Sequence, residues 1–411
     1  MGWVPLHVHS QYSILDASAP IDDIVGRAGA FGMPAVALTD HGNLFGAVEF
    51  YKACQKAKIK PIIGCEVYVA PGSRHDKKKE IGARTSYHLT LLAKNSKGYH
   101  NLCKLSSIGF LEGFYYNPRI DEALLEQHSE GLICLSGCLS GKVAHEALHG
   151  TPETLLSTIK WYQRVFGDDY YLELMRHPMS EEELHADGMY QESWLIQQYQ
   201  DRISKQDKVN SLLYQISKEL RIPVVATNDS HYIERTDWRA HEILINVQSG
   251  EPCEIVEKDS YGNPKFRKPN PKRSTYASHA YDFKSPAQMQ ALFTDMPEAI
   301  ANTLAVAEKC SLELDFKTKH YPIYLPPGLP KQHTREQQAD AVKDYLWFLC
   351  KEGIAKRYTP ERLAKVKEIY NGEDPVKIVN DRLAYEMDII VPKEMADYLL
   401  IVWDFYPLGE K

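Results

Sequence analysis

Short apolar runs alternate with amphipathic stretches along the chain from residue 1 to about residue 230. The apolar runs predict strands at 3–9, 35–39, 62–69, 87–93, 132–136, 170–174 and 223–227. Apolar residues at helical spacing predict helices near 20–31, 46–58, 96–109, 139–166 and 207–220. Because seven strands alternate with helices, we expect an α/β fold with a parallel barrel. An open doubly wound sheet would need a glycine-rich turn after its first strand, where this chain has His7-Val8-His9.

The pattern changes after the seventh predicted strand. Residues 257–273 are rich in Pro, Asn, Lys and Arg and predict a long exposed loop, either a solvated linker or a loop that contacts nucleic acid. From residue 285 the periodicity is almost purely helical, so we expect an α/β domain at 1–284 and a helical region at 285–411. The abrupt end after a strongly apolar last helix suggests a fragment. The helices of this region are predicted at 286–294, 297–311, 335–353, 361–370, 374–390 and 393–403.

Composition and charge narrow the class of protein. The 411 residues are 44% hydrophobic and 25% charged, as in ordinary soluble globular proteins. The net charge of −7 excludes a polycation, so any contact with nucleic acid must come from local basic patches or from parts not present. The eight cysteines are dispersed without a CxxC pair, which favours reduced thiols over a disulfide framework. Without a signal peptide or a long apolar run, we expect a cytoplasmic protein with no membrane partner.

Potential metal ligands stand at or near the ends of successive predicted strands. Imidazole, carboxylate and thiolate groups are the ligands of zinc and other transition metals. His7 and His9 lie two residues apart, so a strand would point both side chains to the same face. The complete set of candidate ligands is His7, His9, Asp16, His41, Glu66, His88, Cys138, Asp229 and His231. So many ligands exceed the needs of one tetrahedral zinc and predict a cluster of two or three divalent metals, which hydrolyses phosphate esters.

The spacing of these ligands resembles the polymerase and histidinol phosphatase (PHP) superfamily. His7, His9 and Asp16 match its first motif, and His41, Glu66 and His88 match the next three. Cys138 stands where the family has His or Cys, and Asp229 with His231 matches the last motif. The resemblance implies a seven-stranded PHP barrel with Zn²⁺ or Mn²⁺ bound. It also implies three metal sites: His7, His9, Glu66 and Asp229; Glu66, His88 and Cys138; and Asp16, His41 and His231.

Longer segments resemble the family of bacterial replicative DNA polymerase III alpha subunits. This resemblance implies DNA, a sliding clamp and a clamp loader as partners, Mg²⁺ for the whole polymerase, and an incomplete, truncated palm at 285–411. The phosphate-binding Gly-Arg-Gly-Ser loop and the three catalytic aspartates of that family do not occur here, so we expect no DNA synthesis by this chain alone. The segments that carry the resemblance are 39–50, 60–66, 114–121, 227–232, 292–303, 382–386 and 400–405.

The resemblance leaves three functions open for the barrel. The first is a metal-dependent 3′–5′ exonuclease that proofreads DNA. Its nucleophile would be a metal-activated hydroxide, so no separate catalytic residue is assigned. The second is a non-catalytic structural module whose metals brace the polymerase and which docks a separate exonuclease. The third is a phosphoesterase like histidinol phosphatase. In this family degraded ligand sets accompany the docking role, so the complete set favours hydrolysis.

Several basic side chains are candidates for contacts with DNA phosphates. Arg119 could hold a phosphate beside Tyr115 and Tyr116, which would stack on bases, although a structural loop whose tyrosines pack on the barrel rim is the favoured interpretation. His177 follows the sixth predicted strand and is either a partner of a metal ligand or a surface residue. The basic side chains of the long predicted loop are Lys265, Arg267, Lys268, Lys272 and Arg273.

Overall fold

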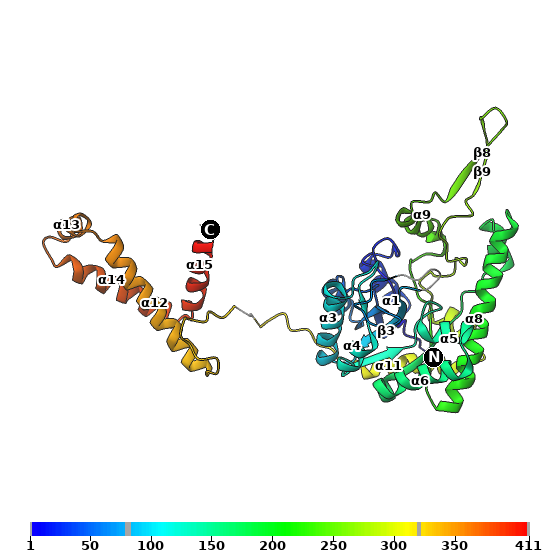
Figure 1. The fold of residues 1–411 in the computed structure, drawn as a ribbon, viewed down its shortest axis with the longest axis horizontal. Helices are drawn as coiled ribbons and strands as arrows, with labels where there is room; N and C mark the ends of the chain where they lie inside the picture. Colours follow the sequence, from blue (N-terminus) through cyan, green and yellow to red (C-terminus); the bar gives the residue numbers. More distant parts are fainter. Residues whose placement is uncertain (1, 79–83, 319–321, 409–411) are drawn as a thin grey trace. The chain divides into compact units, whose positions relative to one another are not determined.

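The computed structural model describes residues 2–78, 84–318 and 322–408. They belong to two compact units, Met1–Leu314 and Asp315–Lys411, each of which we describe by itself (Figure 1). This boundary lies beyond the predicted one at 284/285. The difference arises because α10 (Pro286–Leu292) and α11 (Pro297–Lys309) bury their apolar sides within the first unit.

The first unit is built on a curled sheet of seven strands. The strands run in the order β1-β2-β3-β5-β6-β7, and β4 pairs with β2. All pairs are parallel except those of β3, which runs antiparallel to both β2 and β5. The predicted seven-stranded α/β fold is confirmed, but its all-parallel arrangement is wrong for β3. The strands are β1 (Ala35–Leu38), β2 (Lys60–Val69), β3 (Tyr87–Ala93), β4 (Arg119–Ile120), β5 (Leu132–Leu135), β6 (Tyr170–Met175) and β7 (Val224–Thr227).

Residues 3–9 connect the first and last strands of the sheet without forming a regular strand. Ala37 N donates to Pro5 O at 2.9 Å, and His9 N donates to Ser230 O at 2.8 Å. Val8 and Ser230 form an isolated parallel bridge. Pro5 has no N–H to donate, which limits a continuous ladder. The strand predicted at 3–9 is therefore wrong as a regular element, although the segment lies between β1 and β7.

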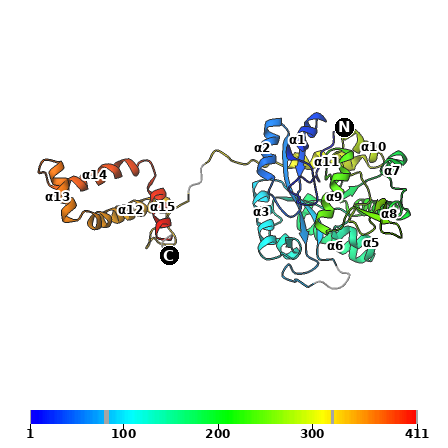
Figure 2. The same ribbon diagram turned by 90° about the horizontal axis from the view of Figure 1, so that it is seen from above.

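Helices surround this sheet, with α1, α2 and α3 on one side of the strands and α5, α6 and α8 on the other (Figure 2). In α1 the buried residues are 21, 24, 25 and 28, the spacing of an apolar helical face. Thr151 caps α6 by accepting from Thr154 N. Sequence patterns missed the short α4 and α7, and also α9. The helices are α1 (Ile21–Ala30), α2 (Ala47–Ala57), α3 (Ser96–Leu111), α4 (Glu122–Gln127), α5 (Lys142–His149), α6 (Pro152–Phe166), α7 (Glu181–Ala186), α8 (Ser193–Leu220) and α9 (Trp238–Ser249).

One end of the barrel is closed by α11. Val4 N donates to Thr303 Oγ1 at 3.0 Å, and Asn302 Nδ2 donates to Val224 O at 2.8 Å at the start of β7. The side chains inside the barrel form one apolar cluster with Val306 of α11. Burial of this cluster leaves only the opposite end of the barrel open to polar side chains.

A two-stranded hairpin stands where the sequence predicted a long loop. Its strands, β8 (Glu254–Lys258) and β9 (Pro264–Pro269), pair antiparallel with Ile255 opposite Lys268. Figure 1 shows the hairpin projecting from the first unit next to α9. The loop prediction is wrong here because both strands are mostly exposed, so burial imposes no apolar alternation on their sequence.

The second unit is helical, as predicted. Its small core contains Val342, Leu346, Met387 and Leu400. In the parts of the chain that the structure describes, no helix is long and apolar enough to cross a membrane. The helices of this unit are α12 (Arg335–Arg357), α13 (Pro360–Ile369), α14 (Pro375–Ile390) and α15 (Ala396–Leu408).

Gly98 allows the start of α3 to approach the loop before β5. A Cβ atom on Gly98 would lie 1.8 Å from the backbone oxygen of Gly131, so the backbone would have to move. We expect Gly98→Ala to destabilise the protein by about 3 kcal/mol, as overpacking against backbone does. Thermal unfolding followed by circular dichroism measures this loss. Gly26→Ala in α1 is the control, because its Cβ meets nothing within 4 Å and should stabilise by about 0.5–1 kcal/mol. Equal melting temperatures for the two variants would contradict the prediction.

Candidate metal centre

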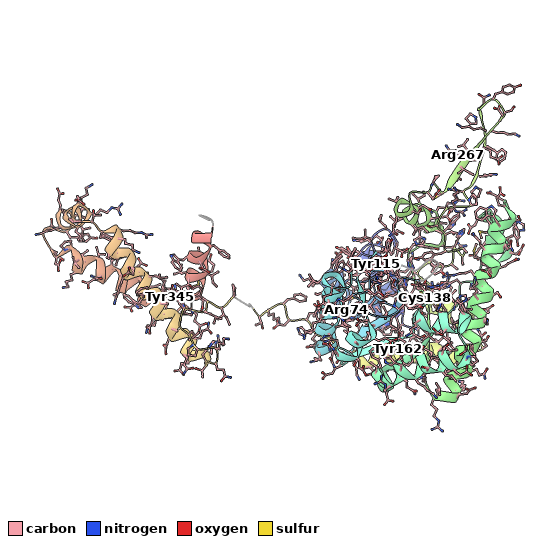
Figure 3. The ribbon with its side chains drawn as sticks, viewed as in Figure 1. Arg74, Tyr115, Cys138, Tyr162, Arg267 and Tyr345 are labelled. Atoms are coloured by element: carbon pink, nitrogen blue, oxygen red, sulfur yellow. The ribbon has the colours of Figure 1, made fainter. Side chains whose placement is uncertain are left out.

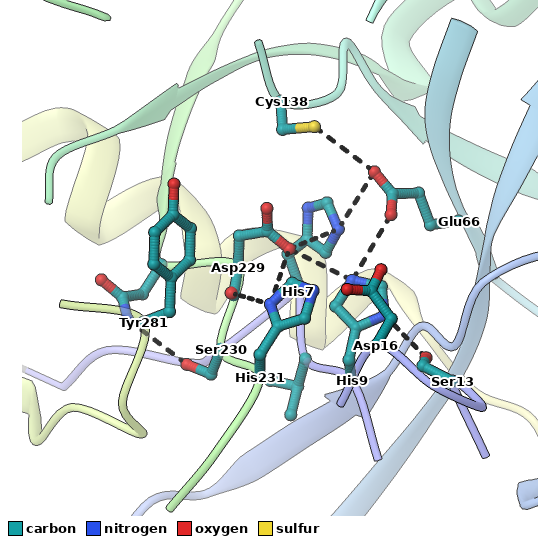
Figure 4. A network of polar contacts seen from close by, with 12 residues as sticks. His7, His9, Ser13, Asp16, Glu66, Cys138, Asp229, Ser230, His231 and Tyr281 are labelled. Atoms are coloured by element: carbon teal, nitrogen blue, oxygen red, sulfur yellow. Dashed lines mark hydrogen bonds and ion pairs between the residues drawn. The ribbon is translucent and has the colours of Figure 1, made fainter. Parts of the chain in front are cut away.

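All nine predicted ligands lie together at the open end of the barrel. Figure 4 labels all of them except His41 and His88. His7 and His9 come from the segment that joins β1 and β7, and Glu66 comes from β2. His88 lies at the N-terminal end of β3, because that strand runs antiparallel to its neighbours. The remaining ligands stand in loops: Asp16 before α1, His41 after β1, Cys138 after β5, and Asp229 and His231 after β7.

The most buried group of ligands contains His7, His9, Glu66 and Asp229. Asp229 Oδ1 lies 3.3 Å from His7 Nε2 and 3.1 Å from His9 Nε2. The Glu66 carboxylate lies 3.5 Å from His7 Nε2 and 3.4 Å from His9 Nε2. One ligand atom of each of the four residues lies within 4.8 Å of the ligand atoms of the other three, as the coordination of one shared ion requires.

Glu66 also faces a second group of ligands. Its Oε1 atom lies 3.0 Å from His88 Nδ1 and 3.6 Å from Cys138 Sγ. Its Oε2 atom lies 2.8 Å from His41 Nδ1. A carboxylate with neighbours on both oxygens is placed to bridge two ions.

Asp16, His41 and His231 form the outer part of the cluster. Asp16 Oδ2 lies 2.7 Å from His41 Nε2. The Tyr276 hydroxyl donates to Asp16 Oδ1 at 2.7 Å and lies 3.1 Å from His231 Nε2. Tyr276 could not be predicted, because nothing in the sequence near residue 276 marks it as a neighbour of the candidate ligands.

Six buried ligand atoms of this cluster lack hydrogen-bond partners. Buried nitrogen and carboxylate oxygen atoms face one another at short distances without hydrogen-bond geometry. Leaving buried polar atoms unpaired costs about 1–3 kcal/mol each, whereas two or three divalent cations among them would give each atom a partner. The residues therefore fit a metal cluster. The unpaired atoms are His7 Nε2, His9 Nε2, both ring nitrogens of His41, Glu66 Oε2 and Asp229 Oδ1.

Hydrogen bonds behind the ligands fix the orientation of their rings. His7 Nδ1 lies 2.7 Å from Glu173 Oε1, an acceptor that keeps the ring proton on Nδ1 and leaves the Nε2 lone pair facing the cluster. His9 Nδ1 lies 2.9 Å from Ser13 Oγ, which in turn donates to Asp40 Oδ1 at 2.7 Å. Such partners raise the basicity of a ligating imidazole and hold its ring in place.

Glu173 is a residue that the sequence analysis did not identify. It is buried on β6, and its carboxylate also accepts from Thr227 Oγ1 at 2.7 Å and from Gly137 N at 3.0 Å. A lone acidic residue in the apolar run 170–175 was the available signal, because a buried carboxylate needs partners.

Glu173→Gln is expected to weaken metal binding about 10–100-fold, as loss of a carboxylate behind a ligating His does. The amide keeps the shape of Glu173 but presents a weaker acceptor to His7 Nδ1. Competition with a metallochromic chelator measures the affinity. Glu183→Gln is the control, because Glu183 lies on α7 and pairs with Arg235 instead of with a candidate ligand. Equal affinities of the two variants would assign Glu173 to folding alone.

Burial and neighbouring charges shift the pKa values of several side chains in the cluster. Burial and the neighbouring His41 and His231 lower the pKa of His9 to about 3, so His9 is a neutral ligand near pH 7. Burial raises the pKa of Asp229, but the histidines around it, above all His7, depress that pKa well below its usual range. Burial, Glu66 and Asp229 raise the pKa of the Cys138 thiol. Metal binding at Cys138 therefore has to release a proton, since thiolates are the ligating form.

Arg119 is a structural residue and not an exposed phosphate ligand. Only 2% of it is exposed, and its guanidinium donates to the carbonyl oxygens of Gly113, Thr85, Arg74 and Asp76 at 2.7–3.2 Å. All of its donor groups face backbone, so the expected contact with DNA is wrong for this side chain.

His177 supports the ligand loop from behind. It is buried, its Nε2 lies 2.8 Å from Asn228 O, and its ring stacks on Tyr281 with centroids 4.0 Å apart. Asn228 precedes Asp229, so His177 positions the backbone of a ligand and is not a surface residue.

The basic side chains of the predicted loop differ in accessibility. Arg267 on β9 has a side chain that is 76% exposed, and Figure 3 shows it on the projecting hairpin. Lys265 and Lys272 are exposed as well. Lys268 pairs with Glu257. Arg273 is only 6% exposed, lies 3.0 Å from Glu242 and packs over Trp194, so it is the least accessible of the five.

Comparison with known proteins gives this arrangement a family. Residues 5–177 match the model of the PHP domain. This region is a PHP domain. The match contains seven of the nine ligands, and the PHP barrel of the structure supplies Asp229 and His231 from beyond it.

The PHP domain belongs to a chain with close relatives among replication proteins. The chain is 53% identical to DNA polymerase III subunit alpha of Chlamydia pneumoniae, over 98% of this chain and 32% of the relative. It is 40% identical to DNA polymerase III subunit alpha of Borreliella burgdorferi, over 98% of this chain and 30% of the relative. The predicted resemblance to these alpha subunits is confirmed, and the chain spans about a third of their length.

Solved structures resemble the PHP domain only distantly. An amidohydrolase from Chromobacterium violaceum is 15% identical with a TM-score of 0.31, over 56% of this chain and 87% of that chain. A likeness at this level carries no argument about function.

Proposed function

We propose that the PHP domain is a metal-dependent phosphoesterase that removes nucleotides from the 3′ end of DNA. The observation that carries this proposal is the complete set of nine candidate ligands, in which six buried atoms of His7, His9, His41, Glu66 and Asp229 lack a hydrogen-bond partner. A cluster of divalent metals clamps the attacking and leaving oxygens of a phosphodiester and supplies a strong nucleophile near neutral pH. Hydrolysis is therefore the chemistry that this site suits best.

The ligands divide into three groups in this proposal. His7, His9, Glu66 and Asp229 would hold the most buried ion, and Glu66 would share a second ion with His88 and Cys138. Asp16, His41 and His231 would hold the third. Zn²⁺ and Mn²⁺ suit this mixture of imidazole, carboxylate and thiolate. Two residues outside these groups have supporting roles: Glu173 orients the ring of His7, and Tyr276 orients Asp16 by donating to it.

The wider setting of this activity would be a bacterial replicase. The relatives are DNA polymerase III alpha subunits, so we propose DNA, a sliding clamp and a clamp loader as partners, and the cytoplasm as the compartment. Asp315–Lys411 would be the beginning of the polymerase palm, and Mg²⁺ would serve the complete polymerase. The exposed Arg267 and Lys272 are the best placed of the basic side chains to contact DNA phosphates.

A structural module is the second candidate function. The cluster joins the segment at 3–9 to β2, β3 and the loops after β1, β5 and β7, so bound metals would brace the whole open end of the barrel. A brace needs the same ligands as a catalyst, and only an assay distinguishes the two.

The test is hydrolysis of a 5′-labelled single strand by the 411-residue chain. The protein is freed of metal, reconstituted with Zn²⁺ or Mn²⁺, and its metal content is measured. Exonuclease activity predicts a ladder of products that shortens from the 3′ end, disappears with chelator and returns with metal. A strand blocked at its 3′ end by a phosphorothioate linkage is the control substrate. Protein with at least two ions per chain and no hydrolysis would overturn the proposal in favour of the structural module.

A further inference from the structure

Arg202 of α8 lies in the wall of the pocket that contains the metal ligands. The pocket has a volume of about 280 Å³ and is lined by Asp16, His41, His88, Cys138, Asp229 and His231 together with Arg202. The ligand set of the PHP domain does not include Arg202. Metal binding by the candidate ligands therefore does not explain why a cationic side chain lies beside them.

The guanidinium of Arg202 is largely without partners. One nitrogen, Nη2, donates to the Tyr281 hydroxyl at 2.5 Å, and the Nε atom is buried without any hydrogen-bond partner. Among the described residues, no carboxylate lies within 4.0 Å of it as an ion pair. The Arg202 side chain is only partly exposed, and a cation withdrawn from water without a counter-ion is costly. Because Arg202 lines the pocket, its unpaired charge favours an anionic ligand there.

The chemistry of the guanidinium selects the kind of anion. Arg presents a planar fork of donors that matches two oxygens of one phosphate group, and such charge-assisted pairs are stronger than neutral hydrogen bonds. Tyr281 contacts this guanidinium on one side. Its hydroxyl accepts a hydrogen bond from Nη2, and its ring centroid lies 5.9 Å from the guanidinium carbon. The side chain is thus oriented before a ligand arrives, which reduces the entropy lost on binding.

We propose that Arg202 binds the phosphate of the 3′-terminal nucleotide while the ligand cluster faces the same phosphate. The proposal rests on the phosphoesterase function proposed above and adds the residue that recognises its substrate. Arg202 acts as a binding residue and takes no proton from the substrate. The same contact holds the phosphate of a released nucleoside 5′-monophosphate, so affinity for this product reports on Arg202 without any hydrolysis.

The test compares Arg202→Met, Arg202→Lys and Lys205→Met. Met keeps the apolar stem of Arg202 without its charge, whereas Lys keeps the charge without the fork. Lys205 lies one turn further along α8, is exposed and pairs with Asp201, so Lys205→Met is the matched control. Calorimetry measures binding of thymidine 5′-monophosphate to each metal-loaded protein. We expect a loss of about 10–100-fold for Arg202→Met, a smaller loss for Arg202→Lys and no change for Lys205→Met.

Further readouts separate this inference from the proposed function. Metal content should be the same in all variants, and thymidine, which has no phosphate, should bind wild type and Arg202→Met equally. In the exonuclease assay Arg202→Met should raise KM for the strand. Unchanged affinity of Arg202→Met for thymidine 5′-monophosphate overturns the inference, even where the wild type is an exonuclease. Arg202-dependent binding by a wild type that hydrolyses no strand supports the inference and overturns only the exonuclease.

Discussion

Asp229→Asn is expected to slow 3′-terminal hydrolysis by at least about 100-fold, because a metal site supplies several kcal/mol of charge stabilisation. The carboxylate of Asp229 approaches both His7 Nε2 and His9 Nε2, so its charge serves the most buried ion. The amide has the same shape but no charge. Initial rates on a 3′-labelled strand, at several concentrations of Mn²⁺, measure the loss.

The backbone conformation of Asp229 accommodates asparagine. Its φ of 51° lies in the left-handed region, which Asn adopts as readily as Asp, so the variant is expected to fold. Asp201→Asn on the exposed side of α8 is the control and should keep the full rate. If wild type and Asp229→Asn hydrolyse the strand equally, the activity belongs to a contaminant.

Removal of metal is expected to lower the melting temperature of the first unit by about 5 °C or more. Ligand linkage stabilises a folded protein by about 2.7 kcal/mol for each ion at 100 times its Kd, and a large domain loses about 2–4 °C per kcal/mol. Without ions, the unpaired nitrogen and oxygen atoms of the cluster remain buried at a cost. Differential scanning calorimetry before and after chelation measures the shift.

The second unit provides an internal control for this experiment. Among its described residues, none belongs to a group of potential metal ligands, so its transition should not move on chelation. Reconstitution with Zn²⁺ or Mn²⁺ should restore the transition of the first unit. A first-unit transition that is indifferent to chelator would contradict a metal-braced barrel.

The candidate ligands could be grouped from the sequence because most of them follow or occupy a buried strand. Glu66 and Asp229 stand far apart in the chain, yet strand ends of one barrel converge, so a list of strand-end residues predicts their meeting. The pattern does not reveal strand direction. In an all-parallel sheet, the end of β3 would lie at the open end of the barrel. Because β3 is antiparallel to β2, its beginning lies there instead, and His88 reaches the cluster from that beginning.

Residues whose roles depend on distant partners could not be predicted in this way. Arg119 has the charge of a phosphate ligand, and only the fold shows that four carbonyl oxygens surround it. The limit of the first unit was missed because α11 has the same helical periodicity as the second unit. Its place in the barrel depends on tertiary contacts such as that of Thr303 with Val4.

The link between residues 3–9 and β7 has a consequence for biosynthesis. His7 and His9 leave the ribosome more than two hundred residues before Asp229 and His231, with which they share a centre. A nascent chain that stops at residue 177 already contains the stretch matched as a PHP domain but has neither of these last ligands. The barrel can therefore close only after the segment with Asp229 and His231 has been synthesised. Stable metal uptake is expected to be a late event in the synthesis of the first unit.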